Sequence, residues 1–390
     1  MDKRLADYRE EVTTALYDIL HYWQQFSVDL QDGGFYGAIN NDNIVQQGSP
    51  KGAVLNSRIL WTFSAACKFD PQPQFLALAN RAYQYLRTHF RDTAFGGVYW
   101  SVTAKGEPLE TRKQVYGQAF LIYALSEYYA IQPSREILDW AIDVYRLLEA
   151  HSYDPVNGGY YEAFSREWGS IEDLRLSAKD DNAAKTMNTH LHVLEAYTNL
   201  YRIWPDEDLR NKIQQLILLF LNKIIHPSTH QQLLFFNTAW EPQSSVVSYG
   251  HDIETSWLLL DAADVLADEA LLHRVKENAV KMALATIAGV AKNGSLQYED
   301  DNTEIHWWVQ AEAMVGFFNA WQLSGEEKYL QLSLNNWSFV KKYIIDHEKG
   351  EWYWGVTASL AIMPGQDKAG FWKCPYHNSR ACLELIHRIV

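Results

Sequence analysis

The hydrophobic residues of this chain cluster in six long segments that are apolar on nearly every side. These segments cover about residues 54–69, 115–131, 185–204, 250–266, 307–323 and 375–389. A helix that is apolar all round is buried on every side, so the pattern predicts six helices in an inner layer.

Segments with one charged face lie between the apolar ones. They cover about residues 74–90, 134–151, 207–226, 269–288 and 326–346. Lys, Arg, Asp and Glu on one side of a helix are typical of an outer layer that faces solvent. The sixth inner segment ends the chain without an outer partner, and the amphipathic segment 5–26 also lacks one. The economical arrangement is a closed ring in which segment 5–26 completes the last pair.

A short turn motif precedes each inner segment. Three clear copies carry glycine pairs, and three weaker copies follow, so the set covers residues 32–37, 95–100, 157–162, 231–236, 293–298 and 349–354. A turn followed by alternating aromatic or β-branched residues predicts a short β-hairpin. Recurrence at intervals of roughly 55 to 75 residues indicates a repeat architecture.

Together these patterns predict an all-α fold, an (α/α)6 barrel of six helix pairs with short β-hairpins at one end. Repeat continuity and the lack of a linker rich in Pro, Ser or Gly favour one domain over residues 1–390. The turns before the inner helices all lie at one end of such a barrel. We therefore expect the chemistry in the first two turns of the six inner helices.

Composition excludes several classes of partner. The formal net charge is −14 and there are no runs of Lys or Arg, which argues against nucleic acid and anionic membranes. The first residues lack the apolar stretch of a signal peptide, and no apolar run is long enough to span a bilayer. Cys67, Cys374 and Cys382 resemble reduced, mostly buried thiols. We expect a cytoplasmic protein that is a monomer or a weak homo-oligomer.

The aromatic content is unusually high, at 14% with 15 Trp and 23 Tyr. Aromatic faces suit ligands with apolar C–H faces, such as sugars. Packing of helix pairs in a large barrel also consumes aromatic side chains, and most of these rings fit that simpler interpretation.

The first three inner segments offer several candidate site residues. Arg58 lies in an otherwise apolar helix, so it must pair with a barrel carboxylate such as Glu254 or Glu312, or face an oxygen-rich ligand. Tyr116 either contacts a substrate or is a core tyrosine. Asn188 and His192 are four residues apart and share a face, which we assign to the barrel interior. His190 points the other way and is assigned to packing.

A polar insert of about residues 166–184 precedes the third inner segment. Loops of this length in a compact domain tend to be lids or binding loops, and disorder without function is the alternative.

The last three inner segments add further candidates. His251 and Glu254 are one turn apart, where a carboxylate can orient an imidazole or hold a substrate hydroxyl. Asp252 suits either a helix cap or a dipole partner. Trp308 and Glu312 share a face of the fifth segment. Trp372 precedes the sixth segment, where Pro375 signals a helix start and places His377 in the first turn.

Two histidines on different helices suit proton transfer. The ordinary pKa of imidazole permits both proton removal and donation near neutral pH. His251 and His377 lie well apart in the predicted ring and can flank a bound sugar. A base on one face of a carbon and an acid on the other invert its configuration, which is epimerisation. Arg58 and Asn188 can stabilise the enediolate formed when the proton α to a carbonyl leaves.

Four motifs carry a family resemblance that runs along essentially the whole chain. They are Asn-Thr-His-Leu-His at 188–192, Tyr-Gly-His-Asp-Ile-Glu-Thr-Ser-Trp at 249–257, Trp-Trp-Val-Gln-Ala-Glu-Ala at 307–313 and Lys-Cys-Pro-Tyr-His-Asn at 373–378. The chain resembles the cellobiose 2-epimerases of the N-acylglucosamine 2-epimerase superfamily. The resemblance implies reversible inversion at C2 of the reducing-end sugar of β-1,4 disaccharides such as cellobiose, lactose and mannobiose, without metal or nucleotide.

The resemblance also implies roles for individual residues. His251 and His377 match the acid/base pair of the family. The residues that match its sugar and intermediate contacts are Arg58, Asn188, His192, Glu254 and Glu312. Trp308 and Trp372 match its stacking platforms, and we expect Tyr116 and Trp257 among the substrate-binding residues.

Other functions stay open at this stage. The superfamily includes monosaccharide 2-epimerases and mannose isomerases. A glycoside hydrolase can use two carboxylates such as Glu254 and Glu312 but leaves the histidines unexplained. His192, His251, His377 and Glu254 are acceptable metal ligands for a metal-dependent isomerase. A sugar-binding module needs the tryptophans but no paired bases.

Overall fold

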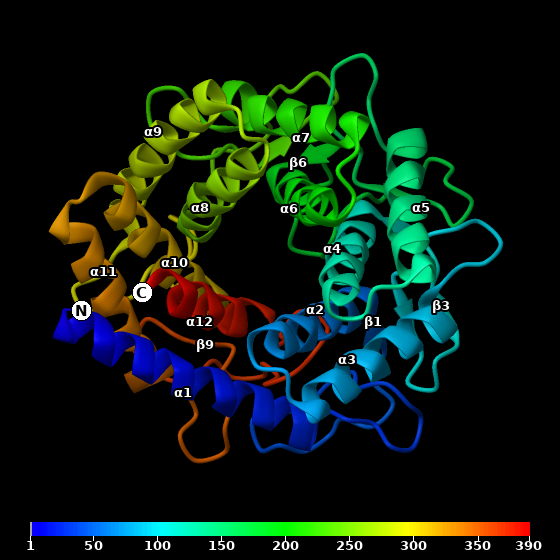
Figure 1. The fold of residues 1–390 in the computed structure, drawn as a ribbon, viewed down its shortest axis with the longest axis horizontal. Helices are drawn as coiled ribbons and strands as arrows, with labels where there is room; N and C mark the ends of the chain where they lie inside the picture. Colours follow the sequence, from blue (N-terminus) through cyan, green and yellow to red (C-terminus); the bar gives the residue numbers. More distant parts are fainter. Residues whose placement is uncertain (1) are drawn as a thin grey trace.

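Twelve α-helices alternate between an inner and an outer ring (Figure 1) in the computed structural model, which describes residues 2–390. The inner helices are α2 (Ala53–Phe69), α4 (Val115–Ile131), α6 (Met187–Ile203), α8 (Tyr249–Val265), α10 (Trp307–Ser324) and α12 (Tyr376–Arg388). The outer helices are α1 (Lys3–Phe26), α3 (Pro73–Tyr85), α5 (Arg135–His151), α7 (Glu207–Leu219), α9 (Glu269–Thr286) and α11 (Glu327–Phe339). The helices α3, α7 and α11 each continue into one wider π-helical turn, at Leu86–Phe90, Phe220–Ile224 and Val340–Ile344.

Both layers follow the hydrophobic pattern of the sequence. In α4, every residue from Val115 to Tyr128 is buried, as expected for a helix enclosed on all sides. In α5 the buried residues Ile137, Trp140, Val144 and Leu148 recur every three or four positions and form one stripe. The inner and outer assignments made from the sequence are confirmed.

The ring is closed by the two ends of the chain. Each inner helix contacts the next, α12 returns to contact α2, and α1 packs along α12 (Figure 1). The buried carboxylate of Glu351 strengthens this closure because it accepts hydrogen bonds from Trp23 of α1 at 2.6 Å, Lys373 at 2.7 Å and Asn378 of α12 at 2.7 Å. The predicted (α/α)6 barrel, with the N-terminal helix completing the last pair, is confirmed.

All six predicted hairpins are present as tight turns closed by a single β-bridge. The bridges are Val28 to Phe35, Arg91 to Val98, Tyr153 to Tyr160, Ile225 to Gln232, Val290 to Leu296 and Ile345 to Trp352. Glycine is required at Gly159, which has φ of +77°, because a Cβ there would lie 2.4 Å from Trp240. The hairpins lie between the ends of the outer helices and the starts of the inner helices.

The regular strands pair between repeats rather than within the hairpins. Each two-residue strand before an inner helix pairs antiparallel with a strand of the following repeat, for example Lys113 with Phe164 and Lys185 with Phe236. The pairs are β1 (Lys51–Gly52) with β2 (Ser101–Val102), β4 (Lys113–Gln114) with β5 (Ala163–Phe164), β6 (Lys185–Thr186) with β7 (Phe235–Phe236) and β8 (Ile305–His306) with β9 (Gly355–Val356). The strand β3 (Pro108–Glu110) extends the first pair to three strands.

Buried lysine–aspartate pairs fix three of the hairpins to the strands that lead into the inner helices. Lys51 pairs with Asp29, Lys113 with Asp92 and Lys185 with Asp154, at 2.8, 2.8 and 2.7 Å. Each lysine also donates to a glycine carbonyl of the same hairpin turn. We call these three pairs the lysine latches.

A hydrogen bond also connects the fourth residue of four inner helices to the hairpin that precedes each helix. The side chains of Gln118, His190, Asp252 and Gln310 accept hydrogen bonds from the backbone N–H groups of Val98, Tyr160, Gln232 and Leu296, at 2.8 to 2.9 Å. Asp252 is therefore not the helix cap that its position suggested, and Ser248 caps α8 instead. The starts of the inner helices are fixed at the end of the barrel that carries the hairpins.

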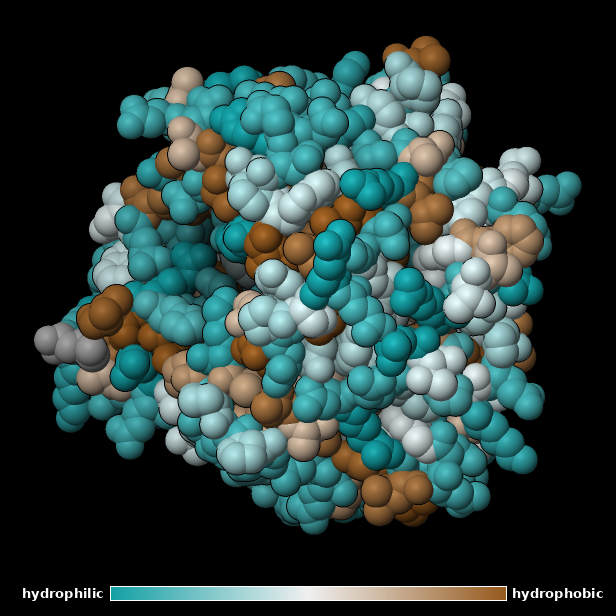
Figure 2. Space-filling view, turned by 45° about the vertical axis from the view of Figure 1, so that its right-hand side comes forward, coloured by the Kyte–Doolittle hydropathy of each residue, from teal (hydrophilic) through white to brown (hydrophobic). Residues whose placement is uncertain are grey.

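The face of the molecule in Figure 2 is largely hydrophilic, with hydrophobic side chains scattered in small groups. Large exposed hydrophobic residues such as Leu30, Leu109 and Val156 lie in separate parts of the sequence. Every helix within the described residues is too short or too polar to cross a membrane.

Candidate active site

The residues proposed from the sequence divide into an accessible wall and a buried floor. Asn188, His251, Trp308 and Trp372 are half-buried near the starts of α6, α8, α10 and α12. The floor consists of side chains that are less than 7% exposed, namely Arg58, Tyr116, His192, Glu254, Trp257, Glu312 and His377. Both sets lie at the hairpin end of the barrel, as the repeat pattern predicts.

The imidazole of His377 is oriented by buried carboxylates. Its Nδ1 lies 2.7 Å from Glu312 Oε1 and 3.8 Å from Glu254 Oε1. An N–H at Nδ1 donates to the carboxylate, so Nε2 is the ring nitrogen left for a ligand. Burial, together with Arg58 and Arg380, holds the pKa of His377 well below its usual range. The resting imidazole is therefore neutral at pH 7.

His251 is oriented by a hydroxyl group. Its Nδ1 lies 2.7 Å from Ser248 Oγ, so the expectation that Glu254 orients this imidazole is wrong. Burial is the main reason that the pKa of His251 is lowered to about 3. Trp308 lies next to both histidines, with ring centres 4.9 Å from His251 and 5.6 Å from His377.

Arg380 on α12 lies at the centre of the floor. Its Nη2 donates to Glu254 Oε1 at 2.9 Å and Glu312 Oε1 at 2.6 Å, and its Nη1 donates to Glu195. Burial opposes ionisation of Glu195, but Arg380 and a hydrogen bond from His192 lower its pKa to about 2.

The other two carboxyl groups that contact Arg380, those of Glu254 and Glu312, disfavour each other's ionisation. Burial and the neighbouring Glu312 raise the pKa of Glu254 against the pull of Arg380. The pKa of Glu312 is also raised, mainly by burial. Two buried carboxyl groups on one guanidinium nitrogen cannot both ionise freely, so the pair holds a proton near neutral pH.

Arg58 does not pair with a carboxylate of the barrel. Arg380 contacts both Glu254 and Glu312, so of the two interpretations of Arg58 the pairing with these carboxylates is wrong. Arg58 donates to Tyr116 Oη at 2.9 Å, and its guanidinium lies 4.2 Å from the ring centre of Phe120. Its buried Nε has no partner among the described residues. The alternative interpretation, a guanidinium available to an oxygen-rich ligand, fits this arrangement.

The third inner helix presents two faces, as expected. His192 faces the interior, where its Nδ1 lies 2.9 Å from Glu195 Oε2 and its ring meets Tyr116 edge-on at 5.0 Å. On the opposite face, His190 Nδ1 donates to Thr186 O at 2.6 Å and its Nε2 accepts from Tyr160 N at 2.8 Å. Both ring nitrogens of His190 are thus occupied by the backbone, consistent with packing.

The two aromatic candidates Trp257 and Trp372 lie in different parts of the site. Trp257 is buried and donates from Nε1 to Glu312 Oε2 at 2.9 Å, which places it beneath the carboxylates. Trp372 is half-buried and lies 5.9 Å from the ring of Tyr116, on the wall. Trp372 is therefore the better placed of the two for stacking on a sugar.

The insert at 166–184 covers one side of the wall. Six residues of the insert, 174–176, 180, 181 and 183, line a cavity together with Asn188 and His251. The insert is attached to the second repeat, because Arg166 pairs with Asp92 at 2.9 Å and Trp168 donates to Phe95 O at 2.8 Å. This arrangement fits a binding loop and not a disordered segment.

Comparisons with known proteins identify the family of the chain. The family model of N-acylglucosamine 2-epimerase (GlcNAc 2-epimerase) matches residues 34–381. The chain belongs to this family. A cellobiose 2-epimerase from Bacteroides fragilis is 46% identical over 393 aligned positions, covering 99% of this chain and 100% of the relative.

Solved structures and a more distant relative extend the family comparison. The structure of a cellobiose 2-epimerase from Bacillus thermoamylovorans superposes with a TM-score of 0.93 at 42% identity, covering 100% of both chains. A D-mannose isomerase from Marinomonas mediterranea is 24% identical and covers 91% of each chain. The chain is thus similar to proteins named for two different reactions of sugars.

Sequence reasoning missed three residues of this candidate site. Arg380 and Glu195 carry charges within inner helices, and the same argument that singled out Arg58 applies to both. Ser248 gave only a weak signal, as a capping residue three positions before a histidine. Contacts between helices of different repeats, such as Arg380 with Glu195, cannot be read from spacing along one helix.

The trio Glu254, Glu312 and His377 also offers ligand atoms within 4.8 Å of one another, a geometry that suits a cation. Arg380 already places a fixed positive charge on both carboxylates at 2.9 and 2.6 Å. The donor set is therefore better matched to hydrogen bonding than to holding a metal.

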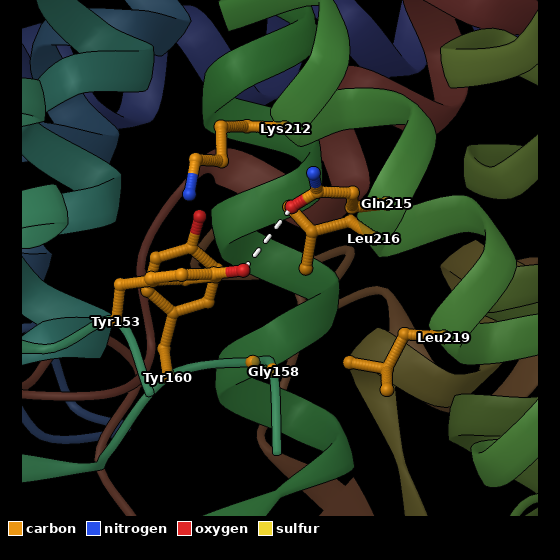
Figure 3. A pocket seen from close by; sticks show the side chains of 8 residues that line it. Tyr153, Gly158, Tyr160, Lys212, Gln215, Leu216 and Leu219 are labelled. Atoms are coloured by element: carbon orange, nitrogen blue, oxygen red, sulfur yellow. Dashed lines mark hydrogen bonds between the residues drawn. The ribbon is translucent and has the colours of Figure 1, made fainter. Parts of the chain in front are cut away.

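A second hollow lies outside the barrel interior, between the third hairpin and α7 (Figure 3). The Nζ of Lys212 lies 3.2 Å from the ring centre of Tyr153 and 2.9 Å from Glu149 Oε2. Tyr153 Oη donates to Gln215 Oε1 at 3.3 Å. These contacts join the hairpin to the outer helix and bring none of the candidate site residues together.

Proposed function

We propose that the protein is a cellobiose 2-epimerase, which reversibly inverts C2 of the reducing-end sugar of β-1,4-linked disaccharides such as cellobiose, lactose and mannobiose. One observation carries the proposal. His251 and His377 both lie next to Trp308, and each has Nδ1 occupied by a fixed partner, so that each can offer Nε2 to one sugar. The 46% identical relative from Bacteroides fragilis bears the same name.

Each proton that moves in this reaction can be assigned to a residue of the site that gives it or takes it. One histidine takes the O1 proton as the ring opens, and the proton held by Glu254 and Glu312 goes to the ring oxygen. The other histidine removes the C2 proton and an enediolate forms. After rotation, the first histidine returns its proton to the opposite face of C2. On ring closure the ring-oxygen proton returns to the carboxyl pair and the second histidine gives its proton to O1, so both imidazoles are neutral again.

The remaining candidate residues bind the sugar and stabilise the enediolate. The guanidinium of Arg58 and the amide of Asn188 are donors for the negative charge on the enediolate oxygens, where each well-placed donor contributes several kcal/mol, on the order of 3. Trp308 and Trp372 provide faces for the sugar rings, and the insert at 166–184 contacts the second sugar. His192, held by Glu195, contributes a further hydrogen bond to substrate.

A D-mannose isomerase activity is the second candidate, supported by the relative from Marinomonas mediterranea. In that reaction the enediolate is protonated at C1, whereas epimerisation returns the proton to C2. A glycoside hydrolase fits less well. Glu254 and Glu312 accept from the same nitrogen of Arg380, whereas hydrolases hold their carboxyl groups roughly 5 to 9 Å apart, flanking the glycosidic bond.

The test is incubation of the protein with lactose or cellobiose in D2O, with EDTA present, followed by NMR of the reducing-end C2 position. We expect deuterium at C2 together with a disaccharide that ends in mannose. Loss of all turnover in EDTA would instead indicate a metal-dependent isomerase. Deuterium at C1 of a ketose product would indicate the isomerase, and released glucose the hydrolase.

A further inference from the structure

The two buried arginines of the floor have opposite surroundings. Arg380 donates to three carboxyl groups. Arg58 is 3% exposed and forms no ion pair with any carboxylate of residues 2–390. Its hydrogen-bond partners are the phenol of Tyr116 at 2.9 Å and the thiol of Cys374 at 3.9 Å. The charge of Arg58 is therefore not neutralised by the groups that contact it.

Aromatic rings surround Arg58 in place of a counterion. Its guanidinium carbon lies 4.2 Å from the ring centre of Phe120, 5.0 Å from that of Tyr376 and 5.8 Å from that of Tyr116. Phe120 is buried on α4, one turn after Tyr116. The negative face of a ring attracts a cation without carrying a net charge. Phe120 has no polar atom, so the ring face is its whole electrostatic contact with Arg58.

A ring and a carboxylate hold a buried guanidinium with different consequences. A carboxylate would form an ion pair with Arg58 and would repel an anion that approaches it. A ring offsets part of the cost of burying the charge and leaves the field of the cation in place. His377 lies within this field, because burial is the main cause of its lowered pKa and Arg58 is the next. Arg58 thus offers an anionic intermediate a positive charge that Arg380, with its carboxyl groups, does not.

We propose that Phe120 is a positioning residue that holds the guanidinium of Arg58 on its ring face and so keeps an unneutralised positive charge available to the enediolate. This role rests on the proposed function. It differs from the role of a phenylalanine that only fills the core, which affects stability and not the rate of the reaction.

The first test compares Phe120→Met with Phe63→Met. Methionine has nearly the volume of phenylalanine but lacks the ring face. Phe63 is a matched control, since it is buried on the inner helix α2 and its ring meets that of Phe75 on the outer helix α3, at 6.2 Å. We expect Phe120→Met to lower kcat for lactose on the order of ten-fold with KM unchanged, because the charge on the enediolate appears only after binding. Phe63→Met should lower the melting temperature without changing kcat, and an unchanged kcat in Phe120→Met overturns the proposal.

A double-mutant cycle determines whether Phe120 acts through Arg58. In an Arg58→Met background the ring has no cation to hold, so the addition of Phe120→Met should leave kcat unchanged. The ring of Phe120 also lies 4.7 Å from that of His192. The same cycle is therefore measured with His192→Gln, in which the loss of kcat caused by Phe120→Met should persist. A loss that persists in Arg58→Met, or that disappears in His192→Gln, overturns the proposal.

An NMR measurement tests the contact without substrate. In protein labelled with ¹⁵N-arginine, with the Arg58 signals assigned from their absence in Arg58→Met, we expect the ring current of Phe120 to shift the guanidinium protons of Arg58 upfield. The shift should be smaller in Phe120→Met, or in Phe120→Leu if Phe120→Met does not fold. Equal shifts in wild type and variant overturn the proposal. If the wild type leaves every disaccharide unchanged, the proposed function fails, and this measurement still decides whether Phe120 holds Arg58.

Discussion

At the residue scale, the two proposed catalytic histidines differ in what holds them. His377 rests on a carboxylate pair that shares Arg380, whereas His251 rests on the hydroxyl of Ser248. Both are neutral at rest because burial disfavours the imidazolium form. A reaction that inverts one carbon requires a base and an acid that are distinct, and these two environments provide that difference.

Removal of either imidazole should abolish epimerisation. We expect His251→Ala and His377→Ala each to lower kcat by a factor on the order of 10² to 10⁴, because general acid–base catalysis contributes that much. Circular dichroism should show a folded protein in both cases. As a control, His273→Ala changes an exposed histidine on α9 and should keep full activity. Activity within ten-fold of wild type in either site variant would contradict the assignment.

His190 should make stability depend on pH without taking part in the chemistry. Burial lowers its pKa to about 4, whereas an unfolded histidine has a pKa near 6.5. Between these values the unfolded chain binds a proton that the native protein does not, so acidification removes stability. The total is about 3 kcal/mol.

The measurement is urea unfolding of wild type and His190→Gln at pH 7 and pH 4.5. The wild type should lose more free energy of unfolding between the two pH values than the variant does, since all other groups titrate alike in both. Equal losses would show that His190 is protonated in the native state. Complete loss of activity at a normal melting temperature would place His190 in the active site.

Sequence alone predicted the residues of the wall and those of the floor other than Arg380 and Glu195. Asn188, His251, Trp308 and Trp372 were found because an (α/α)6 barrel gathers the first turns of its inner helices at one end. Partners across the barrel were not found, because periodicity along one helix does not determine which residue of another helix it meets. For that reason the sequence left open a pairing of Arg58 with carboxylates that belong to Arg380.

At the scale of elements, the lysine latches attach each of the first three hairpins to the strand before an inner helix. The sequence predicted the hairpins from their turn residues and the helices from their apolar pattern. It did not predict the latches, since a lysine before a helix ordinarily suggests an exposed side chain. The latches place charge in the interior, where it is tolerated only when it is paired.

Two of the latches form a matched comparison. Asp154 has one cationic partner, Lys185, whereas Asp92 is held by both Lys113 and Arg166. Lys185→Met leaves a buried carboxylate without a cation and should cost about 3 to 5 kcal/mol of unfolding free energy. Lys113→Met should cost less because Arg166 remains. Denaturant melts of both variants give the comparison, and an equal or reversed order would show that Arg166 contributes nothing to the second latch.

At the scale of the whole molecule, the barrel is one closed ring, which supports the interpretation of residues 1–390 as a single domain. The first helix covers the last, and Glu351 joins both of them to the sixth hairpin. Within residues 2–390 there is therefore no place where a set of repeats ends with its own capping surface, unlike an open solenoid.

We therefore expect thermal unfolding in one cooperative transition, in which near-ultraviolet circular dichroism and residual activity decline together.

Deletion of residues 2–26 uncovers α12, which carries His377 and Arg380, and should abolish folding and activity together. The variant Arg4→Ala, which changes a half-exposed side chain of α1, should melt as the wild type does. Two separated transitions, or an active truncated protein, would disprove the single-domain interpretation.

The pairing of α1 with α12 also has a consequence for synthesis on the ribosome. The apolar stripe of α1 is synthesised before the other helices of the barrel, and the helix that covers it is synthesised after them. Until α12 emerges, this stripe lacks its native partner, and the second proposed catalytic histidine has not yet been made. A nascent chain that has not reached α12 is therefore inactive, and α1 is a natural binding segment for chaperones that recognise exposed apolar surface.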